Sequence, residues 1–468
     1  MDSGAGLQTG AENTLGTWLR HMPFVFTLVV ICVFLGMAKP FHSDKPNEWD
    51  DVYLHSARQL AQGNDLYKDV PLYTYPPFMA WLFIPLSILP TPVARTAWFL
   101  ICVSSILVMV NVAWKLANAR GERLFPGQTT APSLSIWLIF LVGLAFGARP
   151  AFTALLHHQT DLLMDALIFL GMLALARKRP GWGAVCFGFA GAMKCTPLLW
   201  CAYYLVAGPR RWMLVPALVA IVANLLPNLT HMPHTGNLWL TDWVQAKVLC
   251  LMGTYPGHWN TDVMCNQSLS GSFYAWCVTS WSWGETGFQI LSREPLCSPT
   301  ALKAIVYGIG LTLLTASLAL IWWETRQHTT QDRNTIQGLR RWLLREVIPV
   351  YPTQALHFSL ILLLMLLLSP MSHKTHFGLL LLPGFVLARV AWERRNPVLI
   401  GLLGLLITGQ IATMHFWSVK LSHFAYWHGI QMFTTLGLWT GCLYSAWRWG
   451  RAQALQPVPS IADFRQAA

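Results

Sequence analysis

Apolar segments that approach membrane-spanning length alternate with short polar segments along most of this 468-residue chain. A helix needs about 20 predominantly apolar residues to cross the hydrocarbon core of a bilayer. The segments at or near that length are 23–38, 96–117, 134–147, 162–176, 213–230, 301–323 and 353–369, with two or three more before residue 447. The pattern predicts an all-α polytopic membrane protein, with about 10 to 12 transmembrane helices in a membrane domain at residues 21–447.

The polar segments are expected to divide between the two sides of the membrane. Residues 1–20 are polar and Gly-rich, and we expect a disordered cytoplasmic N-terminus there and a cytoplasmic tail at 448–468. No small-residue cleavage site follows the first apolar run, which predicts a retained helix that also acts as an uncleaved signal. The two long loops, 41–75 and 231–300, are expected on the external side.

One short apolar segment, residues 78–89, disturbs the regular alternation. It is interrupted by Pro85 and is marginal for a full crossing. If it does cross, the basic cluster formed by Lys115, Arg120 and Arg123 lies outside, against the positive-inside rule. Either this segment is re-entrant or the rule fails locally.

A second irregularity lies between the basic clusters 177–179 and 210–211. Both clusters favour the cytoplasmic side, yet the residues between them suffice for one crossing only. The sequence therefore predicts a hairpin of two half-helices that turns at Lys194–Pro197. A lysine in apolar surroundings is costly unless it faces a cavity, so Lys194 is a candidate functional residue.

Composition supports a membrane protein and narrows its partners. Only 11% of the residues are charged, against about 25% in soluble domains, and the 24 tryptophans suit membrane–water interfaces. The net charge of +12 comes from short clusters of Lys and Arg between apolar runs, with no sustained basic helix or aromatic platform. We therefore expect a lipid bilayer around the protein and no nucleic acid partner.

Four of the ten cysteines lie in the external loop 231–300: Cys250, Cys265, Cys277 and Cys297. An even number of cysteines on an oxidising side permits two disulfides. Their spacing resembles no zinc motif, so no metal site is predicted.

Polar and ionisable residues gather in five places that this topology puts on the external side. They are Glu48–Asp51 with Tyr53; Tyr73 and Tyr75; Arg149 with His157–Gln159 and Asp161; Lys194; and Ser369–His376. Each group has an ordinary structural interpretation, because loop carboxylates are usually solvated and histidines often cap helix ends. Desolvated charges are costly unless they are paired or used, so their convergence predicts a site for an anionic substrate. One carboxylate would act as a base, and the cations would neutralise a phosphate leaving group.

A transporter or flippase of a lipid-linked or small anionic substrate is the main alternative. The hydropathy pattern shows no clear internal repeat, and the polar residues lie near one interface instead of the bilayer midplane, where transporter sites usually lie. Channel-like selectivity sequences are also absent. The sequence therefore favours an enzyme.

The same polar residues resemble the motifs of a known family. The motifs are Asp50-Asp51-Val52-Tyr53 with Tyr73-Thr74-Tyr75-Pro76-Pro77; His158-Gln159-Thr160-Asp161; Lys194-Cys195-Thr196-Pro197; Asn266-Gln267-Ser268-Leu269; and Ser369-Pro370-Met371-Ser372 with His376. In this order they resemble glycosyltransferase family 87, the bacterial polyprenol-phosphate-mannose-dependent alpha-mannosyltransferases of the GT-C superfamily. Two positions depart from its Gly-Gln-x-Asn motif, since His158 stands for the glycine and Asp161 for the asparagine.

The resemblance implies a hexosyltransferase with a GT-C fold in the bacterial inner membrane and an active site that faces the periplasm. It implies a polyprenyl-phosphate-sugar donor, a glycan or glycolipid acceptor, and inverting transfer without metal or cofactor. The implied sugar is mannose, with arabinose or another sugar as the alternative. The family's catalytic base is an aspartate of the first external loop, here Asp50 or Asp51, with Asp50 preferred. Lys194 and Arg149 are the candidates for the phosphate. The other candidate substrate contacts are Tyr53, Tyr73, Tyr75, His158, Gln159, Asn266, Gln267, His373 and His376.

Overall fold

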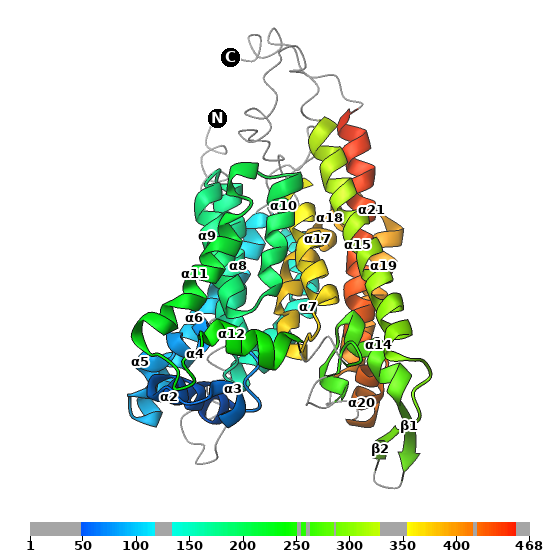
Figure 1. Ribbon diagram of the computed structural model, residues 1–468. Helices are drawn as coiled ribbons and strands as arrows, with labels where there is room; N and C mark the ends of the chain where they lie inside the picture. Colours follow the sequence, from blue (N-terminus) through cyan, green and yellow to red (C-terminus); the bar gives the residue numbers. More distant parts are fainter. Residues whose placement is uncertain are drawn as a thin grey trace, which may run out of the picture.

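The protein is described by a computed structural model that covers residues 48–117, 133–249, 254–258, 263–284, 287–327, 353–414 and 419–454. The first apolar run, the N-terminal tail, residues 455–468, Arg120, Arg123 and Cys250 lie outside these residues. The described part is a bundle of helices (Figure 1). Its main helices are α6 (Thr91–Leu116), α7 (Ser133–Leu156), α8 (Asp161–Ala176), α9 (Pro180–Met193), α10 (Trp200–Val206), α11 (Val215–Thr230), α15 (Pro299–Gln327), α17 (Thr353–Leu368), α18 (Leu381–Glu393), α19 (Pro397–Ala412) and α21 (Ile430–Ala454).

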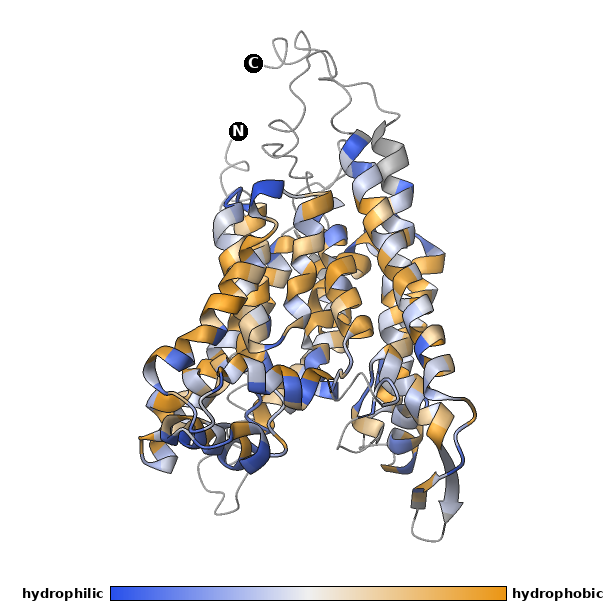
Figure 2. Ribbon diagram, viewed as in Figure 1, coloured by the Kyte–Doolittle hydropathy of each residue, from blue (hydrophilic) through white to orange (hydrophobic). Residues whose placement is uncertain are grey.

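The bundle confirms an all-α polytopic membrane protein. Among the described residues, five helical segments are long and apolar enough to span a bilayer: Thr91–Leu116, Ile136–Leu156, Arg210–Thr230, Pro299–Arg326 and Lys374–Glu393. Three shorter apolar helical segments run beside them, Thr196–Val206, Thr353–Leu368 and Pro397–Ala412. Apolar residues dominate the middle of the bundle and hydrophilic residues gather toward its ends (Figure 2). The expected total of about 10 to 12 crossings stays a prediction.

The two ends of the bundle differ in character. The end that carries the basic residues of 177–179, 210–211 and 394–395 is called the basic end below, and the opposite end is called the site end. Arg389 near the end of α18 donates to the carbonyl of Ala117 just after α6 (3.1 Å), so α6 finishes at the basic end. The short helices before α6 all lie at the site end.

Residues 78–89 do not cross the bundle. They form α4 (Pro77–Leu82) and α5 (Ile84–Ser87), which lie beside η1 (Trp49–Leu54), α2 (His55–Gln62) and α3 (Leu66–Asp69) at the site end (Figure 1). The ring of Pro85 and the shortness of each helix prevent a crossing. Trp81 Nε1 donates to Thr230 Oγ1 at the end of α11 (2.9 Å), which fixes this layer in place. Lys115 in the last turn of α6 therefore reaches the basic end, as the positive-inside rule requires.

The predicted hairpin around Lys194 is present. Helix α9 packs between α8 and α11 and ends at Met193, where Lys194 adopts an extended conformation. The chain then turns through η2 (Thr196–Leu199), with Pro197 in its first turn, and returns along α10. It reaches the basic end again at η3 (Arg210–Trp212). The turn therefore places Lys194 at the site end.

Helix α7 is longer than expected. The sequence predicted a span at 134–147 followed by a polar interruption from Arg149, but the helix continues through Pro150 to Leu156. Its packing explains this result, because a Cβ added at Gly143 would lie 2.0 Å from the ring of Phe385 in α18. A helix held so closely against its neighbour keeps its direction despite the hydrogen bond that a proline removes.

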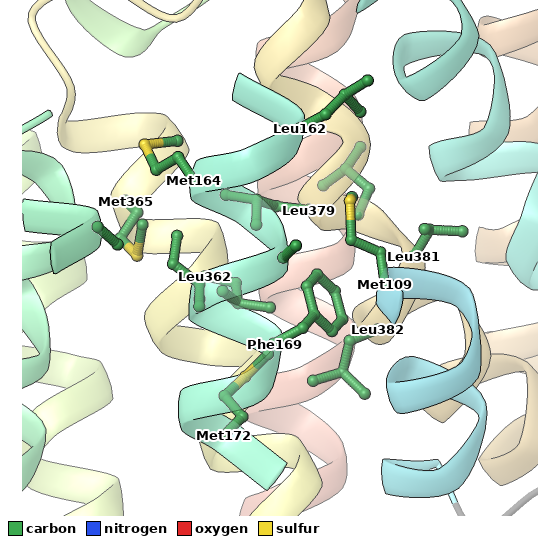
Figure 3. Close-up of a cluster of buried hydrophobic side chains, with 14 of the residues drawn as sticks. Met109, Leu162, Met164, Phe169, Met172, Leu362, Met365, Leu379, Leu381 and Leu382 are labelled. Carbon is green, nitrogen blue, oxygen red and sulfur yellow. The ribbon is translucent and has the colours of Figure 1, made fainter. Parts of the chain in front are cut away.

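A methionine-rich core lies inside the bundle, next to the site end. Side chains from α6, α8, α17 and the η7 (Lys374–Leu380)–α18 segment meet there (Figure 3). Among them, Met109, Phe169 and Leu362 are completely buried. This core fixes the first turn of α8 and the whole of η7 relative to each other, which positions the polar residues that these two elements carry.

The segment 231–300, expected as a loop, contains helices and a β-hairpin. It contains α12 (Trp239–Trp243), η4 (Val244–Leu249), η5 (Val263–Cys265) and α14 (Leu269–Val278). A hairpin of β1 (Thr279–Gly284) and β2 (Gly287–Ser292) follows, antiparallel, with Thr279 opposite Ser292. The aromatic side chains of the hairpin pack against α20 (Val419–Trp427), as in the edge-to-face pair of Trp281 with Phe424. A scan for apolar runs overlooks elements that are held by such isolated aromatic contacts.

Candidate active site

The centre of the candidate site is a buried group of charges contributed by α8, the α9–α10 turn and η7. Lys194 Nζ lies 3.6 Å from Asp161 Oδ1, and His376 Nε2 lies 3.2 Å from the same oxygen. Thr375 Oγ1 donates to Asp161 Oδ2 (2.9 Å). The Asp161 side chain is only 1% exposed whereas that of Lys194 is 18% exposed, so Lys194 is the member that a ligand can reach.

The protons of this group cannot all be accommodated at once. His376 Nδ1 accepts the backbone N–H of His373 (2.9 Å), and Lys194 Nζ lies 2.6 Å from His376 Nε2. A neutral imidazole has one acceptor nitrogen, so the ring cannot accept from both donors. The Lys194 ammonium therefore has donor capacity that His376 does not use and that a ligand anion could accept. The group therefore has the chemistry of an anion site.

A second network extends from this centre toward η1. The Tyr53 hydroxyl lies 3.0 Å from Gln159 Oε1 and 3.1 Å from the Tyr75 hydroxyl. Gln159 Nε2 donates to Glu48 Oε2 (2.5 Å), and Lys194 Nζ lies 6.0 Å from the centre of the Tyr75 ring. Burial raises the pKa of the Tyr53 and Tyr75 phenols well above the ordinary value, so both remain neutral hydrogen-bonding groups.

The two candidate bases differ in their surroundings. Asp50 accepts hydrogen bonds from Arg95 at the start of α6, with 3.1 Å from Nε and 2.5 Å from Nη2 to Oδ2. Its side chain is 16% exposed, whereas Asp51 is an exposed residue. Nε also donates to Oδ1 (3.3 Å). Arg95 therefore fixes the orientation of the Asp50 carboxylate, which stays partly exposed to a ligand.

His158 lies beside Asp50 and explains one departure from the family motif. Its backbone φ is 52°, in the left-handed region that favours glycine, and its carbonyl accepts from Trp98 Nε1 (2.8 Å). A glycine at this position would serve the backbone turn between α7 and α8. Burial and the charge of Arg95 lower the pKa of the His158 ring, so it is neutral near pH 7.

Arg149 lies apart from Lys194. The Arg149 guanidinium donates to Thr413 and sits 5.9 Å from the centre of the Tyr426 ring in α20. Lys374 Nζ lies 6.0 Å from the same ring. Within the described residues, neither cation has a carboxylate partner within 4.0 Å. The two expected phosphate contacts therefore differ. Lys194 has a carboxylate partner, Asp161, whereas Arg149 has none within the described residues.

His373 and Tyr73 have structural contacts close to the site. His373 Nδ1 caps η7 by accepting from the Thr375 backbone, and burial together with the charges of His376 and Lys374 lowers its pKa to about 3. The ring is therefore neutral at any physiological pH. The Tyr73 hydroxyl donates to the Pro76 carbonyl and accepts from the Ala80 amide, both at 2.9 Å, and so holds the turn that leads into α4.

Asn266 and Gln267 tie together loops that surround the site. Asn266 Nδ2 donates to the carbonyls of Gly257 and Pro370 (3.1 and 3.0 Å) and its Oδ1 accepts from the Ser372 amide (3.1 Å). Gln267 Nε2 donates to the carbonyl of Tyr426 (2.7 Å). Both amides are engaged inside the protein, which gives them a positioning role for η7 and α20.

We expect Asn266→Ala to lower the melting temperature of the purified protein by several degrees, because each buried backbone group left unsatisfied costs about 1–3 kcal/mol. Asn237→Ala, at an exposed position of the same segment 231–300, is the matched control and should leave the melting temperature unchanged. Thermal unfolding in detergent, followed by tryptophan fluorescence, measures both. If Asn266→Ala melts like wild type, the positioning role is wrong.

Several residues of this arrangement were not among the candidates. Glu48, Asp161 and Thr375 belonged to the polar groups but were not selected, and Lys374 was passed over beside two histidines. The crowding of ionisable residues in those segments was a usable signal. Arg95 had no such signal, because an arginine at the start of an apolar helix resembles an ordinary membrane boundary.

A comparison with known proteins identifies the family. The sequence pattern of glycosyltransferase family 87 matches residues 73–339, which is more than half of the chain. This chain belongs to glycosyltransferase family 87. The matched range of the family contains Tyr73, Gln159, Lys194 and Asn266, whereas Asp50 lies before it and His373 and His376 lie after it.

Three curated mannosyltransferases are similar to this family 87 chain. A polyprenol-phosphate-mannose-dependent alpha-(1-2)-phosphatidylinositol pentamannoside mannosyltransferase of Mycolicibacterium smegmatis is 26% identical over 309 residues, 66% of this chain and 62% of the relative. The protein of the same description from Mycobacterium tuberculosis is 23% identical over 253 residues, 52% of this chain and 56% of the relative. A phosphatidylinositol mannoside mannosyltransferase of M. smegmatis is 27% identical over 190 residues, 37% and 42% of the two chains. The chain therefore covers less than two thirds of each relative.

Proposed function

We propose that this protein is a membrane glycosyltransferase that transfers mannose from a polyprenyl phosphate to a hydroxyl group of a glycolipid. The observation that carries the proposal is the gathering of a carboxylate base candidate, Asp50, and reachable cations at one end of an apolar bundle. Family membership and the names of the three relatives support the donor and the glycolipid acceptor. The site end would face the periplasm of a bacterial inner membrane.

The bond changes of the reaction need a base and a leaving group. Asp50 accepts the proton of the acceptor hydroxyl, whose oxygen then attacks the anomeric carbon of the sugar. The bond between that carbon and the phosphate oxygen breaks on the opposite face, which inverts the anomeric configuration and releases polyprenyl phosphate. Arg95 orients the Asp50 carboxylate through hydrogen bonds to its oxygens.

The negative charge that develops on the departing phosphate requires cations. Lys194 has three N–H donors, forms an ion pair with Asp161 and keeps a reachable side chain, so it can donate to a phosphate oxygen. Arg149 and Lys374, which lack carboxylate partners among the described residues, add positive potential on the α20 side. Such preorganised charges stabilise a developing anion strongly in a site that excludes water.

A transfer assay in proteoliposomes tests the proposed function. Radiolabelled polyprenyl-phosphate-mannose and a phosphatidylinositol mannoside acceptor are supplied together, and the lipid products are separated. We expect a longer glycolipid and no transfer from a nucleotide sugar. Movement of the intact donor across the vesicle membrane without any new glycosidic bond would overturn the enzyme and favour the transporter.

Removal of divalent metals should leave the transfer rate within about two-fold, because Lys194, Arg149 and Lys374 supply the charge that a metal provides in other transferases. The assay is repeated after EDTA treatment, with and without added Mg²⁺ or Mn²⁺. Loss of transfer that returns with the added metal would contradict this assignment of the cations.

A further inference from the structure

Two thiols meet at the base of the β1–β2 hairpin. Cys277 lies in the last turn of α14 and Cys297 follows β2, and their Sγ atoms are 3.3 Å apart. Both are free in the structure, Cys277 buried and Cys297 half-buried. Backbone hydrogen bonds clamp the two segments together, from Leu296 N to the Cys277 carbonyl (3.0 Å) and from Arg293 N to the Val278 carbonyl (3.2 Å).

This geometry is suited to a covalent bond. Bonded sulfur atoms lie about 2.05 Å apart, so the thiols need to approach by little more than about 1 Å. The Cys297 carbonyl accepts from the Tyr255 hydroxyl (3.1 Å), which fixes the backbone on that side. No group of three metal-ligating side chains exists among the described residues, so the two thiols are not half of a metal centre there.

We propose that Cys277 and Cys297 form a disulfide in the protein as it matures in the membrane. The two thiols lose two protons and two electrons, and a protein disulfide oxidant takes them up and becomes a dithiol. Such oxidants act outside the reducing cytosol, so the bond also places the site end of the bundle in an oxidising compartment. The inference rests on the thiol geometry and is independent of the proposed transferase activity.

The bond would stabilise one wall of the candidate site. It closes the segment that carries β1 and β2, and the hairpin packs on α20, where Trp427 Nε1 donates to Thr279 Oγ1 (3.0 Å). Tyr426, one residue before Trp427, contacts the cations Arg149 and Lys374. The disulfide is therefore linked to the site through α20.

Mapping of thiols in the full-length protein tests the bond. Membranes are solubilised in denaturant with excess N-ethylmaleimide and no reductant, and peptides are analysed by mass spectrometry. We expect a linked pair that contains Cys277 and Cys297, lighter than the two free peptides by about 2 Da and separated by reductant. Cys102 and Cys442, buried in the helical bundle, serve as internal controls and should be alkylated. Alkylation of both Cys277 and Cys297, or linkage of either to Cys250 or Cys265, would overturn the proposal.

Melting temperatures of cysteine variants, with and without reductant, provide a second test of the bond. Cys277→Ser and Cys297→Ser each leave one reactive thiol, and the double variant leaves none. Reductant should lower the melting temperature of the wild type by about 5 °C, to that of the double variant, and should not change the double variant. A reductant effect of equal size on both proteins would show that the bond is elsewhere.

Discussion

Asp50→Asn lowers kcat/KM for sugar transfer by about 100- to 10,000-fold in our expectation, the range that is typical for loss of a general base. The amide keeps the shape of the carboxylate and still accepts from Arg95, but it cannot take the proton of the acceptor hydroxyl. Binding of the lipid donor should change little, so the loss appears in kcat more than in KM. Initial rates in the proteoliposome assay, with donor and acceptor varied in turn, give both parameters.

Two neighbouring carboxylates provide matched controls. Asp51→Asn removes an exposed carboxylate from the same turn of η1 and should transfer sugar at a rate close to that of wild type. Glu48→Gln preserves a hydrogen-bonding partner for Gln159 and should cost less than Asp50→Asn. If Asp51→Asn or Glu48→Gln abolishes transfer while Asp50→Asn retains it, the base is misassigned. Melting temperatures close to wild type would show that unfolding does not cause the loss.

The second large effect is expected from Lys194→Met, which keeps the apolar stem and removes the ammonium. Loss of one preorganised donor to a developing anion typically costs about 100- to 1,000-fold in rate. The same change leaves the buried Asp161 carboxylate without its cation, and breaking a buried pair costs about 3–5 kcal/mol of stability. Activity and stability must therefore be separated.

A double variant separates them. Asp161→Asn alone restores the residue that the family motif usually carries and should keep activity, because the amide oxygen still accepts from Lys194. In Lys194→Met with Asp161→Asn the charges balance again, so we expect the melting temperature to recover while transfer remains low. Recovery of transfer together with the melting temperature would show that Lys194 has a structural role and does not contact the phosphate.

The sequence was sufficient to predict the elements that are determined by local apolar length. Helices α6, α11, α15 and α17 follow the expected segments closely, and the turn at Lys194 follows from charge on both flanks. The predicted end of α7 was wrong, because the close packing of Gly143 on Phe385 is a tertiary contact that leaves no pattern in the local sequence. The hairpin of loop 231–300 was missed for a similar reason, since its aromatic side chains pack on α20 far along the chain.

The candidate site shows the same division. The residues were predictable as types, since charges in a membrane protein are rare and costly. Their pairings were not predictable, because Asp50 meets Arg95 across 45 positions and Gln159 meets Glu48 across 111. The sequence also could not predict whether Lys194 and Arg149 share partners. In the structure Lys194 contacts Asp161, and Arg149 contacts Tyr426.

The two short helices α4 and α5 also decide whether Asp50 and Lys194 lie on the same side of the membrane. They stay at one end, so among the described residues four helices, α6 to α9, run between the two ends from Asp50 to Lys194, which is an even number of passages. One additional passage at residues 78–89 would make that number odd and would carry the base and the cation to opposite faces of the membrane. If a few added apolar residues made α4 and α5 cross the membrane, activity would be lost. A larger insertion in a loop, which leaves the number of passages even, would be tolerated better.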